Sequence, residues 1–447
     1  MNTHASPHVF QRASAAVMPV AIGGDGIFIT TKDGRRVLDG CGGAAVSCLG
    51  HSDRTVVEAI KTQLDTLPYA HTGFFTSEPA EELATMLADR APEGISRTYF
   101  VSGGSEAAEA AIKLARQYYL EKGEERSRII ARRQSYHGNT LGALAAGGNE
   151  WRRSQFAPLL SDAYSHIAAC HHWRWGEPGE SAEEYGRRVA DELEAELLRV
   201  GPETVAAFMA EPVVGATMGA VPAVPGYFRR IREICDRYGV LLVLDEVMCG
   251  MGRTGTLFAC EEDDVRPDMI LIAKGLGAGY QPIGAMLVSE EIHATVAGGS
   301  GFFQHGHTYM GHPSACAGGV AVLNAIEERN LLANVNAMGA RLREGLEARF
   351  GQHPNVGDIR GLGLFLGIEL VADRNTKAPL PRENKTHAKI KKAAFARDLM
   401  VYPMGGTIDG ANGDHILIAP PFIATEKDID TILERLDEAV AEVLPGR

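Results

Sequence analysis

Short apolar segments alternate with longer amphipathic segments through the middle of the chain. The residues LLVL before Asp245 and MILIA before Lys274 are apolar without interruption, which is typical of strands buried on both faces of a sheet. We predict strands over 98–102, 128–132, 205–210, 240–244, 269–273 and 284–288, with helices such as 106–119, 182–198 and 227–238 between them. This alternation predicts an α/β fold whose mostly parallel sheet is covered by helices.

The pattern changes near residue 320. Two helices are predicted over 319–328 and 331–350, followed by the strand-like segment GLFLGIEL and by a helix, a strand and a helix in the last 60 residues. We therefore expect a smaller α+β domain built from both termini. The predicted division is an N-terminal segment over 1–65, a large domain over 66–325 and a C-terminal small domain over 326–447.

The charge balance narrows the possible partners. The 447 residues include 44 Lys and Arg against 57 Asp and Glu, a formal net charge of −13. An acidic chain argues against a nucleic acid or an anionic membrane as partner, because both require basic surfaces. No apolar stretch approaches the roughly 18 residues of a membrane span, and the N-terminus lacks a basic start with a long apolar run. We expect a cytoplasmic enzyme.

The cysteines and histidines do not predict a metal site. The seven cysteines are scattered and contain no C-x-x-C pair, which favours reduced thiols over disulfides or a thiolate zinc site. His305, His307 and His312 are close in sequence, but no carboxylate or cysteine spacing supports a metal reading. We predict no metal.

In an open parallel sheet, ligands bind beyond the carboxyl ends of the strands. Two charged residues lie at such ends of predicted apolar strands. Asp245 ends LLVLDEV, and Lys274 follows 29 residues later, directly after five apolar residues. Desolvation lowers the pKa of a lysine and so favours a nucleophilic amine. A simple ion pair between the lysine and a carboxylate is the alternative interpretation.

Glycines near both segments favour a bound anion. Gly275, Gly277 and Gly279 let the backbone after Lys274 pass close to a ligand. The segment TYFVSGGSEAAEAAIKLA is typical of a strand, a glycine turn and an amphipathic helix. Backbone N–H groups at such a helix start form a phosphate site. The spacing differs from that of a nucleotide P-loop.

An imine-forming amine, a buried carboxylate and a phosphate cup together describe the handling of pyridoxal 5′-phosphate (PLP). The pyridine nitrogen of this cofactor requires an acidic partner, and Asp245 fits that role. Tyr136 in SYHGNT is placed to stack on one face of the ring and Val247 to cover the other. Tyr136 could instead be a core aromatic whose hydroxyl is satisfied locally.

At these residues the chain resembles the class III aminotransferases, the ω-aminotransferase subgroup of fold-type I PLP enzymes. The resemblance runs from about Gly24 to Leu444. It implies a large α/β domain with a mostly parallel seven-stranded sheet and a smaller α+β domain. The motifs that carry it are SGGSEAAEAAIKLAR, SYHGNT, AEPV, LDEVMCGMGRTG, IAKGLGAGYQPIGA, GHTYMGHPSACAGG, RGLGLFLGIEL and APPF.

The resemblance implies roles for individual residues. Lys274 is implied to form the Schiff base and Asp245 to pair with the pyridine nitrogen. The remaining cofactor contacts implied are the phosphate cup of Gly103, Gly104 and Ser105, the aromatic Tyr136 with His137 beside it, Val247, the carboxylate Glu211 and the phosphate-binding Thr308. The family commonly has Ser-Gly-Ser or Ser-Gly-Thr in the cup, so Gly103 is a departure. Because Thr308 would reach the phosphate of a neighbouring subunit, a homodimer is implied, with a tetramer also open.

The resemblance further implies ping-pong transfer of an amino group from an amine to a keto acid. Many relatives bind the keto-acid carboxylate with an Arg in an R-P-x-G pattern, where this chain has Tyr402. Another cation, Arg153 or His71, or hydrogen bonds from Tyr402 could replace it. The substrate pocket is predicted to include Tyr69, Phe75, Trp151 and Tyr402. We expect a primary amine distal to a carboxylate, or without one, as donor and pyruvate as acceptor.

Other functions on the same scaffold remain open. These are a decarboxylase, an aminomutase and a transaminase specific for 2-oxoglutarate. A PLP-binding regulator is disfavoured because no DNA-binding segment or basic face accompanies the motifs. A nucleotide-binding domain is disfavoured because GLGLFLG lacks the G-x-G-x-x-G spacing.

Overall fold

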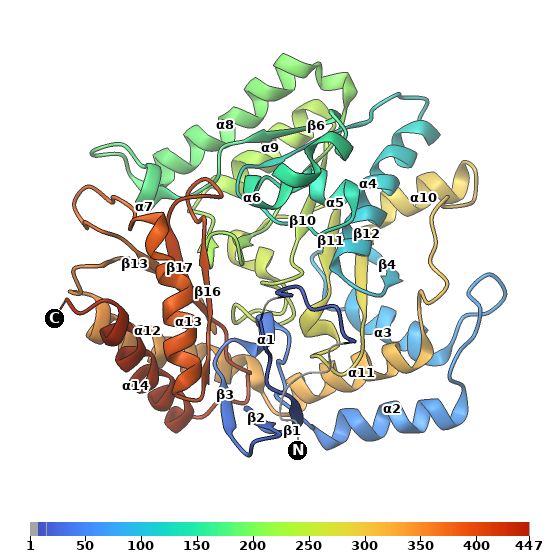
Figure 1. Ribbon diagram of the computed structural model, residues 1–447. Coiled ribbons are helices and arrows are strands. Elements are labelled where there is room, and N and C mark those ends of the chain that lie inside the picture. The colour runs from blue at the N-terminus through green and yellow to red at the C-terminus, as the bar shows by residue number, and fades with distance from the viewer. Residues whose placement is uncertain (1–7, 15, 447) are drawn as a thin grey trace.

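A seven-stranded sheet forms the centre of the protein (Figure 1). The computed structural model describes residues 8–14 and 16–446. The strand order is β4 (Ile95–Val101), β12 (Gly284–Ser289), β11 (Met269–Ile272), β10 (Leu241–Asp245), β7 (Val205–Ala210), β5 (Arg128–Arg132) and β6 (Tyr164–Ile167). Only β12 runs antiparallel to its neighbours. The predicted mostly parallel α/β sheet is confirmed.

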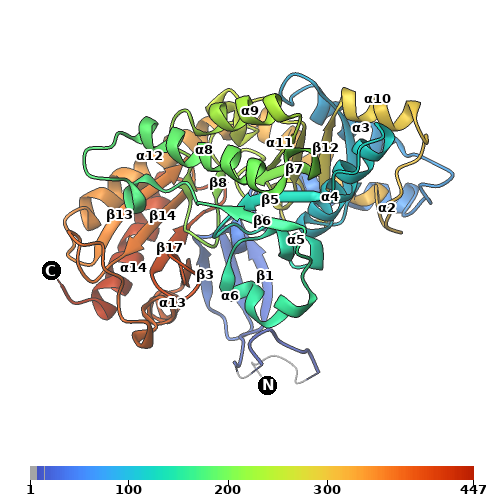
Figure 2. The ribbon, with the colours of Figure 1, turned by 90° about the horizontal axis from the view of Figure 1, so that it is seen from above.

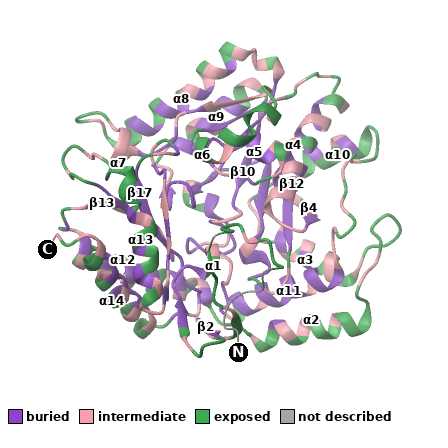
Figure 3. Cartoon of the chain, viewed as in Figure 1, coloured by how far each residue is buried: buried purple, intermediate pink, exposed green. Residues whose placement is uncertain are grey.

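Helices pack on both faces of this sheet (Figure 2). Alternate residues of β10 face opposite cores: Leu242 and Leu244 join one apolar cluster, and Leu241 and Val243 join the other. The first cluster includes α3 (Glu78–Ala88), α8 (Ala182–Val200), α9 (Tyr227–Tyr238) and α11 (Pro313–Glu328). The second includes α4 (Gly104–Glu121) and α10 (Glu290–Gly298). Figure 3 shows the central strands as mostly buried.

The C-terminal region forms a second, antiparallel sheet. Its order is β13 (Val356–Leu362), β14 (Phe365–Leu370), β17 (Asp414–Ile418) and β16 (Tyr402–Gly405). The helices that pack with it are α12 (Leu331–Phe350), α13 (Thr386–Ala396) and α14 (Glu426–Val443). Where one strand was predicted in the last 60 residues, the structure has β16, β17 and the short β15 (Leu399–Met400), because the segment turns back on itself.

The N-terminal strands join this C-terminal region. The meander β1 (Ala21–Asp25), β2 (Phe28–Thr31) and β3 (Arg36–Asp39) ends with β3 pairing in parallel with β15. Ile27 and Leu38 share one apolar cluster with α12 and α14. This sharing agrees with a small domain drawn from both termini, and the boundaries at 65/66 and 325/326 stay predictions.

The remaining elements are short or lie at the edges. They are α1 (Gly42–Ala45), α2 (Arg54–Thr66), α5 (Leu141–Ala146), α6 (Glu150–Arg153), α7 (His172–Trp175), β8 (Val213–Val214) and β9 (Val221–Pro222), with 3₁₀ turns between several of them. Within the described residues, no helix combines the length and apolar character that crossing a bilayer requires. All seven cysteines are buried free thiols.

Candidate active site

Five strands of the large sheet bring their carboxyl ends to one cavity of about 510 Å³. Lys274 follows β11, Asp245 ends β10 and Glu211 follows β7. The glycine turn follows β4, and Tyr136 follows β5 after a short turn. The predicted residues that line this cavity are Gly103, Gly104, Ser105, Tyr136, His137, Glu211, Asp245, Val247 and Lys274.

The amine of Lys274 lies in a desolvated position. Lys274 comes two residues after β11 and has a left-handed φ of 42°, which costs an L-residue about 1–2 kcal/mol. Desolvation lowers the pKa of Lys274 below its ordinary value, and the carboxylates of Asp245 and Glu211 act in the opposite direction. The fold therefore holds a strained lysine whose amine is more easily deprotonated than a surface amine.

Asp245 is fixed through both of its carboxylate oxygens. The backbone N–H of Val247 donates to Oδ1 over 3.0 Å, and Nδ1 of His137 lies 2.7 Å from Oδ2. Nε2 of His137 is buried without a hydrogen-bond partner among the described residues. The carboxylate is thus held rigidly in the cavity, where the low dielectric strengthens electrostatic interactions between charged groups.

Glu211 connects two loops of the cavity wall. Its Oε1 accepts from the backbone N–H of Tyr136, and its Oε2 accepts from that of Gly215, each over 3.0 Å. Burial raises the pKa of this carboxyl above its usual value. Because both oxygens already bind backbone amides, Glu211 positions Tyr136 as well as lining the cavity.

The glycine turn opens the N-terminus of α4 toward the cavity. Gly103 caps the helix, and the carboxylate of Glu106 accepts from the backbone N–H of Ser102 over 2.7 Å. A Cβ atom on Gly104 would lie 2.7 Å from Cγ1 of Val247, whereas one on Gly103 would meet nothing within 4 Å. The first backbone N–H groups of α4 have no intrahelical partner, so the turn provides donors for an anion.

Tyr136 carries a cation on its ring. The guanidinium carbon of Arg152 lies 4.5 Å from the ring centre. Burial raises the pKa of the Tyr136 hydroxyl, and the charge of Arg152 opposes this rise. The sequence did not indicate this contact, because Arg152 belongs to the separate helix α6.

The other predicted residues do not line this cavity of their own chain. The hydroxyl of Tyr69 donates to the backbone oxygen of Thr308 over 3.0 Å. Trp151 is 59% exposed, and Tyr402 lies on β16. Their proposed contacts with cofactor or substrate stay predictions.

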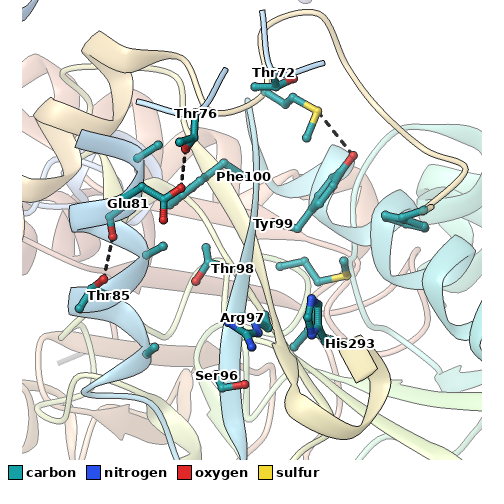
Figure 4. Close-up of a pocket in the computed structure, with 18 of the residues that line it drawn as sticks. Thr72, Thr76, Glu81, Thr85, Ser96, Arg97, Thr98, Tyr99, Phe100 and His293 are labelled. Atoms are coloured by element: carbon teal, nitrogen blue, oxygen red, sulfur yellow. Dashed lines mark hydrogen bonds between the residues drawn. The ribbon is translucent and has the colours of Figure 1, made fainter. Parts of the chain in front are cut away.

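Phe75 lines a different cavity, of about 670 Å³. Figure 4 shows this cavity between α3, with Glu81 and Thr85, and β4, with Tyr99. Its lining includes the charged residues Glu81, Asp89, Arg97 and His293 but no lysine. The larger cavity therefore lacks an amine that could form an imine, and we assign the chemistry to the smaller one.

Sequence reasoning missed several lining residues of the Lys274 cavity. These are Val46, Ser102, Ala216, Met248, Ala273, Tyr280, Gln281, Pro282 and Ile283. Gln281 and Pro282 lie in the same motif as Lys274, so proximity in sequence could have found them. Val46 comes from the N-terminal region, and only the fold reveals its place.

Comparisons with known proteins extend over nearly the whole chain. The family description "Aminotransferase class-III" matches residues 10–440. An uncharacterized aminotransferase of Schizosaccharomyces pombe is 45% identical over 95% of this chain and 93% of its own, and aminotransferase YodT of Bacillus subtilis is 39% identical over 98% of both. An (S)-enantioselective omega-transaminase from Thermomicrobium roseum has a TM-score of 0.91 at 37% identity, covering 98% of this chain and 96% of its own. The omega-transaminase of Pseudomonas jessenii, solved with PMP, has a TM-score of 0.92 at 32% identity, with the same coverage.

Proposed function

The chain belongs to the PLP-dependent class III aminotransferases, and from this premise we propose that it moves an amino group from a primary amine to a keto acid such as pyruvate by a ping-pong mechanism. The observation that carries the proposal is the meeting of Lys274 and Asp245 in one cavity. Because Tyr402 stands where many relatives have an arginine, we expect a donor whose amine is distal to a carboxylate or that has no carboxylate.

The residues of the cavity fit the cofactor. His137 presents an unpartnered buried nitrogen, Gly103 leaves open space beside the start of α4, and Lys274 presents its amine. Lys274 would hold the cofactor aldehyde, Asp245 its pyridine nitrogen, and the amides of Gly104 and Ser105 its phosphate. When bound, PLP supplies an electron-accepting ring that stabilises negative charge on the substrate carbon.

Lys274 also moves the proton in the proposed reaction. An amine with a lowered pKa can act first as a general base and take a proton from the substrate carbon. It can then act as a general acid and deliver that proton to the cofactor carbon that Lys274 had held. His137 and Val247 hold both carboxylate oxygens of Asp245, so this carboxylate would be fixed in position beside the ring. Tyr136, positioned by Glu211, covers one face and Val247 the other.

A half-reaction screen tests the proposal. Purified holoenzyme is mixed with single amines in the absence of any keto acid, and the visible absorbance of the lysine-bound cofactor is followed. We expect primary amines to bleach it with release of the carbonyl product, and pyruvate to restore it. Strict dependence on α-amino acids as donors would contradict the proposed donor class. Release of carbon dioxide, or more than one equivalent of product per active site in the absence of a keto acid, would contradict transamination itself.

We expect the two glycines of the phosphate cup to respond differently to a methyl group. In Gly104→Ala, the new Cβ would overlap the side chain of Val247, so the glycine turn and Val247 must move apart. PLP affinity should fall about tenfold, the loss of roughly 1.4 kcal/mol. Gly103→Ala is the matched control, since its Cβ meets nothing and its φ of 172° is extended. Equilibrium titration of the apoenzyme with PLP measures both, and equal affinities would contradict the assigned cup.

The active site is proposed to need a homodimer. Thr308 does not line the cavity of its own chain, which supports a role toward the phosphate of a neighbouring subunit. Sedimentation of the holoenzyme should give a dimer or a tetramer, and a fully active monomer would contradict this arrangement.

A further inference from the structure

A cation binds the carboxylate of a keto acid well, and the lining of the Lys274 cavity holds no lysine or arginine besides Lys274 itself. Its charged or titratable lining side chains include Lys274, Asp245, Glu211 and His137. Lys274 is used for the chemistry in the proposed function, and Tyr402 stands where many relatives have an arginine. A cation next to the cavity is therefore one way to bind this carboxylate, with hydrogen bonds from Tyr402 as the alternative.

The two cations suggested by the sequence are engaged elsewhere. Arg153 donates to the backbone oxygens of Ala145, over 2.7 Å, and Gly147, and its Nε lies 3.7 Å from Glu150. His71 is exposed, and its Nδ1 accepts from the backbone N–H of Gly73. Neither side chain lines the Lys274 cavity; Arg152 does not line it either, but its guanidinium stacks on Tyr136, which does.

Arg152 is different from its neighbour. Within residues 8–14 and 16–446, no carboxylate forms an ion pair with it, and its buried Nε has no hydrogen-bond partner. Instead, its guanidinium carbon lies 4.5 Å from the ring centre of Tyr136 and 5.7 Å from that of Trp151. A partly buried cation held on aromatic rings without an anion is ready to accept one.

The position of Arg152 is fixed by the turn that also carries Tyr136. The side chain of Asn149 caps α6 by accepting from the Arg152 N–H, and its Nδ2 donates to Oε1 of Gln134 over 3.1 Å. Nε2 of Gln134 in turn donates to the backbone oxygens of Gly406 and Thr407 over 2.8 and 2.9 Å. The backbone of Arg152 is therefore held in place relative to the turn that carries Tyr136, and the guanidinium itself contacts the rings of Tyr136 and Trp151.

Arg152 and Tyr402 both act on the same hydroxyl. The charge of Arg152 lowers the pKa of Tyr136, whereas Tyr402 raises it. The guanidinium carbon of Arg152 lies 4.5 Å from the ring centre of Tyr136, and Tyr136 lines the Lys274 cavity. A cation stacked on Tyr136 therefore lies next to the wall of the Lys274 cavity.

We propose that Arg152 is the specificity residue that binds the substrate carboxylate, through a bidentate guanidinium–carboxylate pair at the Tyr136 wall. The proposal rests on the proposed function and deepens it. Keto acids and amino acids with a free carboxylate would be recognised by Arg152, whereas amines without a carboxylate would leave it stacked on Tyr136.

Arg152→Gln tests this role in the holoenzyme. We expect KM for pyruvate to rise about 10- to 100-fold, the range for losing hydrogen bonds to a charged group. The rate of the half-reaction with benzylamine, which has no carboxylate, should stay within about twofold of wild type, since the cation is not needed there. Arg152→Lys should be intermediate, because it keeps the charge but loses the fork.

Two controls make the result decisive. Arg133→Gln removes an exposed arginine from the turn that carries Tyr136. Arg133 does not line the cavity, so KM for pyruvate should not change. Calorimetric titration with propionate, which cannot react, should show binding to wild type and loss of binding in Arg152→Gln.

Four outcomes would overturn the proposal. An unchanged KM for pyruvate, or equal losses in both half-reactions, would reduce Arg152 to a support for Tyr136. If the wild type converts pyruvate but binds propionate no more tightly than Arg152→Gln does, Arg152 does not contact the carboxylate. The proposed transamination would still stand in that case. A wild type that reacts with no amine would contradict the proposed function, and the role of Arg152 with it.

Discussion

Lys274→Ala should lower kcat by about 10⁴-fold or more, at the upper end of what general acid–base catalysis contributes. The substitution removes the amine that holds the cofactor and the group that moves the proton. The phosphate cup and Asp245 are untouched, so the variant should still bind PLP, more weakly and without the absorbance of the lysine-bound form. Stopped-flow and steady-state assays of the purified variant measure both effects.

The structure offers controls for this variant. Lys392 lies on the exposed face of α13, and Lys392→Ala should keep full activity. A small primary amine in the buffer should partly restore proton transfer to Lys274→Ala, since the cavity left by the side chain can admit it. Borohydride treatment of wild type should attach the cofactor to Lys274. Turnover near the wild-type rate, or an adduct on a different residue, would refute the assignment.

Most strands of the large sheet could be predicted because the residue patterns that identify a strand lie within that strand. Uninterrupted apolar segments identify β7, β10 and β11, and the charged residues that end them mark the carboxyl edge. Strand β6 was missed: its sequence YSHI has two polar residues at its centre, and the strand lies at a sheet edge. Edge strands have weaker apolar signals than central strands because one side faces no neighbour.

The contacts that tune the site could not be predicted in the same way. The pairing of His137 with Asp245 joins residues 108 positions apart, and the contact of Arg152 with Tyr136 depends on how α6 folds back. The sequence suggested Arg153 as a substitute cation, but helix geometry directs it toward backbone oxygens and Arg152 toward the aromatic ring. Such choices between adjacent residues depend on tertiary packing rather than on composition or spacing.

Asp245→Asn should lower kcat/KM by about 10³-fold, equivalent to roughly 4 kcal/mol of barrier. The substitution removes the charge and keeps the shape. The amide oxygen can still accept from the Val247 N–H, and the amide nitrogen can donate to Nδ1 of His137 once the histidine proton moves to Nε2. The fold should therefore persist while the ring loses its anionic partner, and PLP binding should weaken less than the rate.

Glu246→Gln, one residue further on, separates this electronic effect from a structural one. Both Glu246 oxygens accept backbone N–H groups, from Ala259 over 2.5 Å and from Cys260 over 2.8 Å, and the side chain does not line the cavity. A glutamine would turn an NH₂ group toward one of these donors, leaving an unsatisfied buried group. Glu246→Gln should lower Tm and leave the turnover of the folded enzyme near wild type, and Asp245→Asn should do the reverse. If Asp245→Asn kept more than about a tenth of the wild-type rate, the carboxylate would not be the partner of the ring nitrogen, and its fixed position between His137 and Val247 would serve the fold alone.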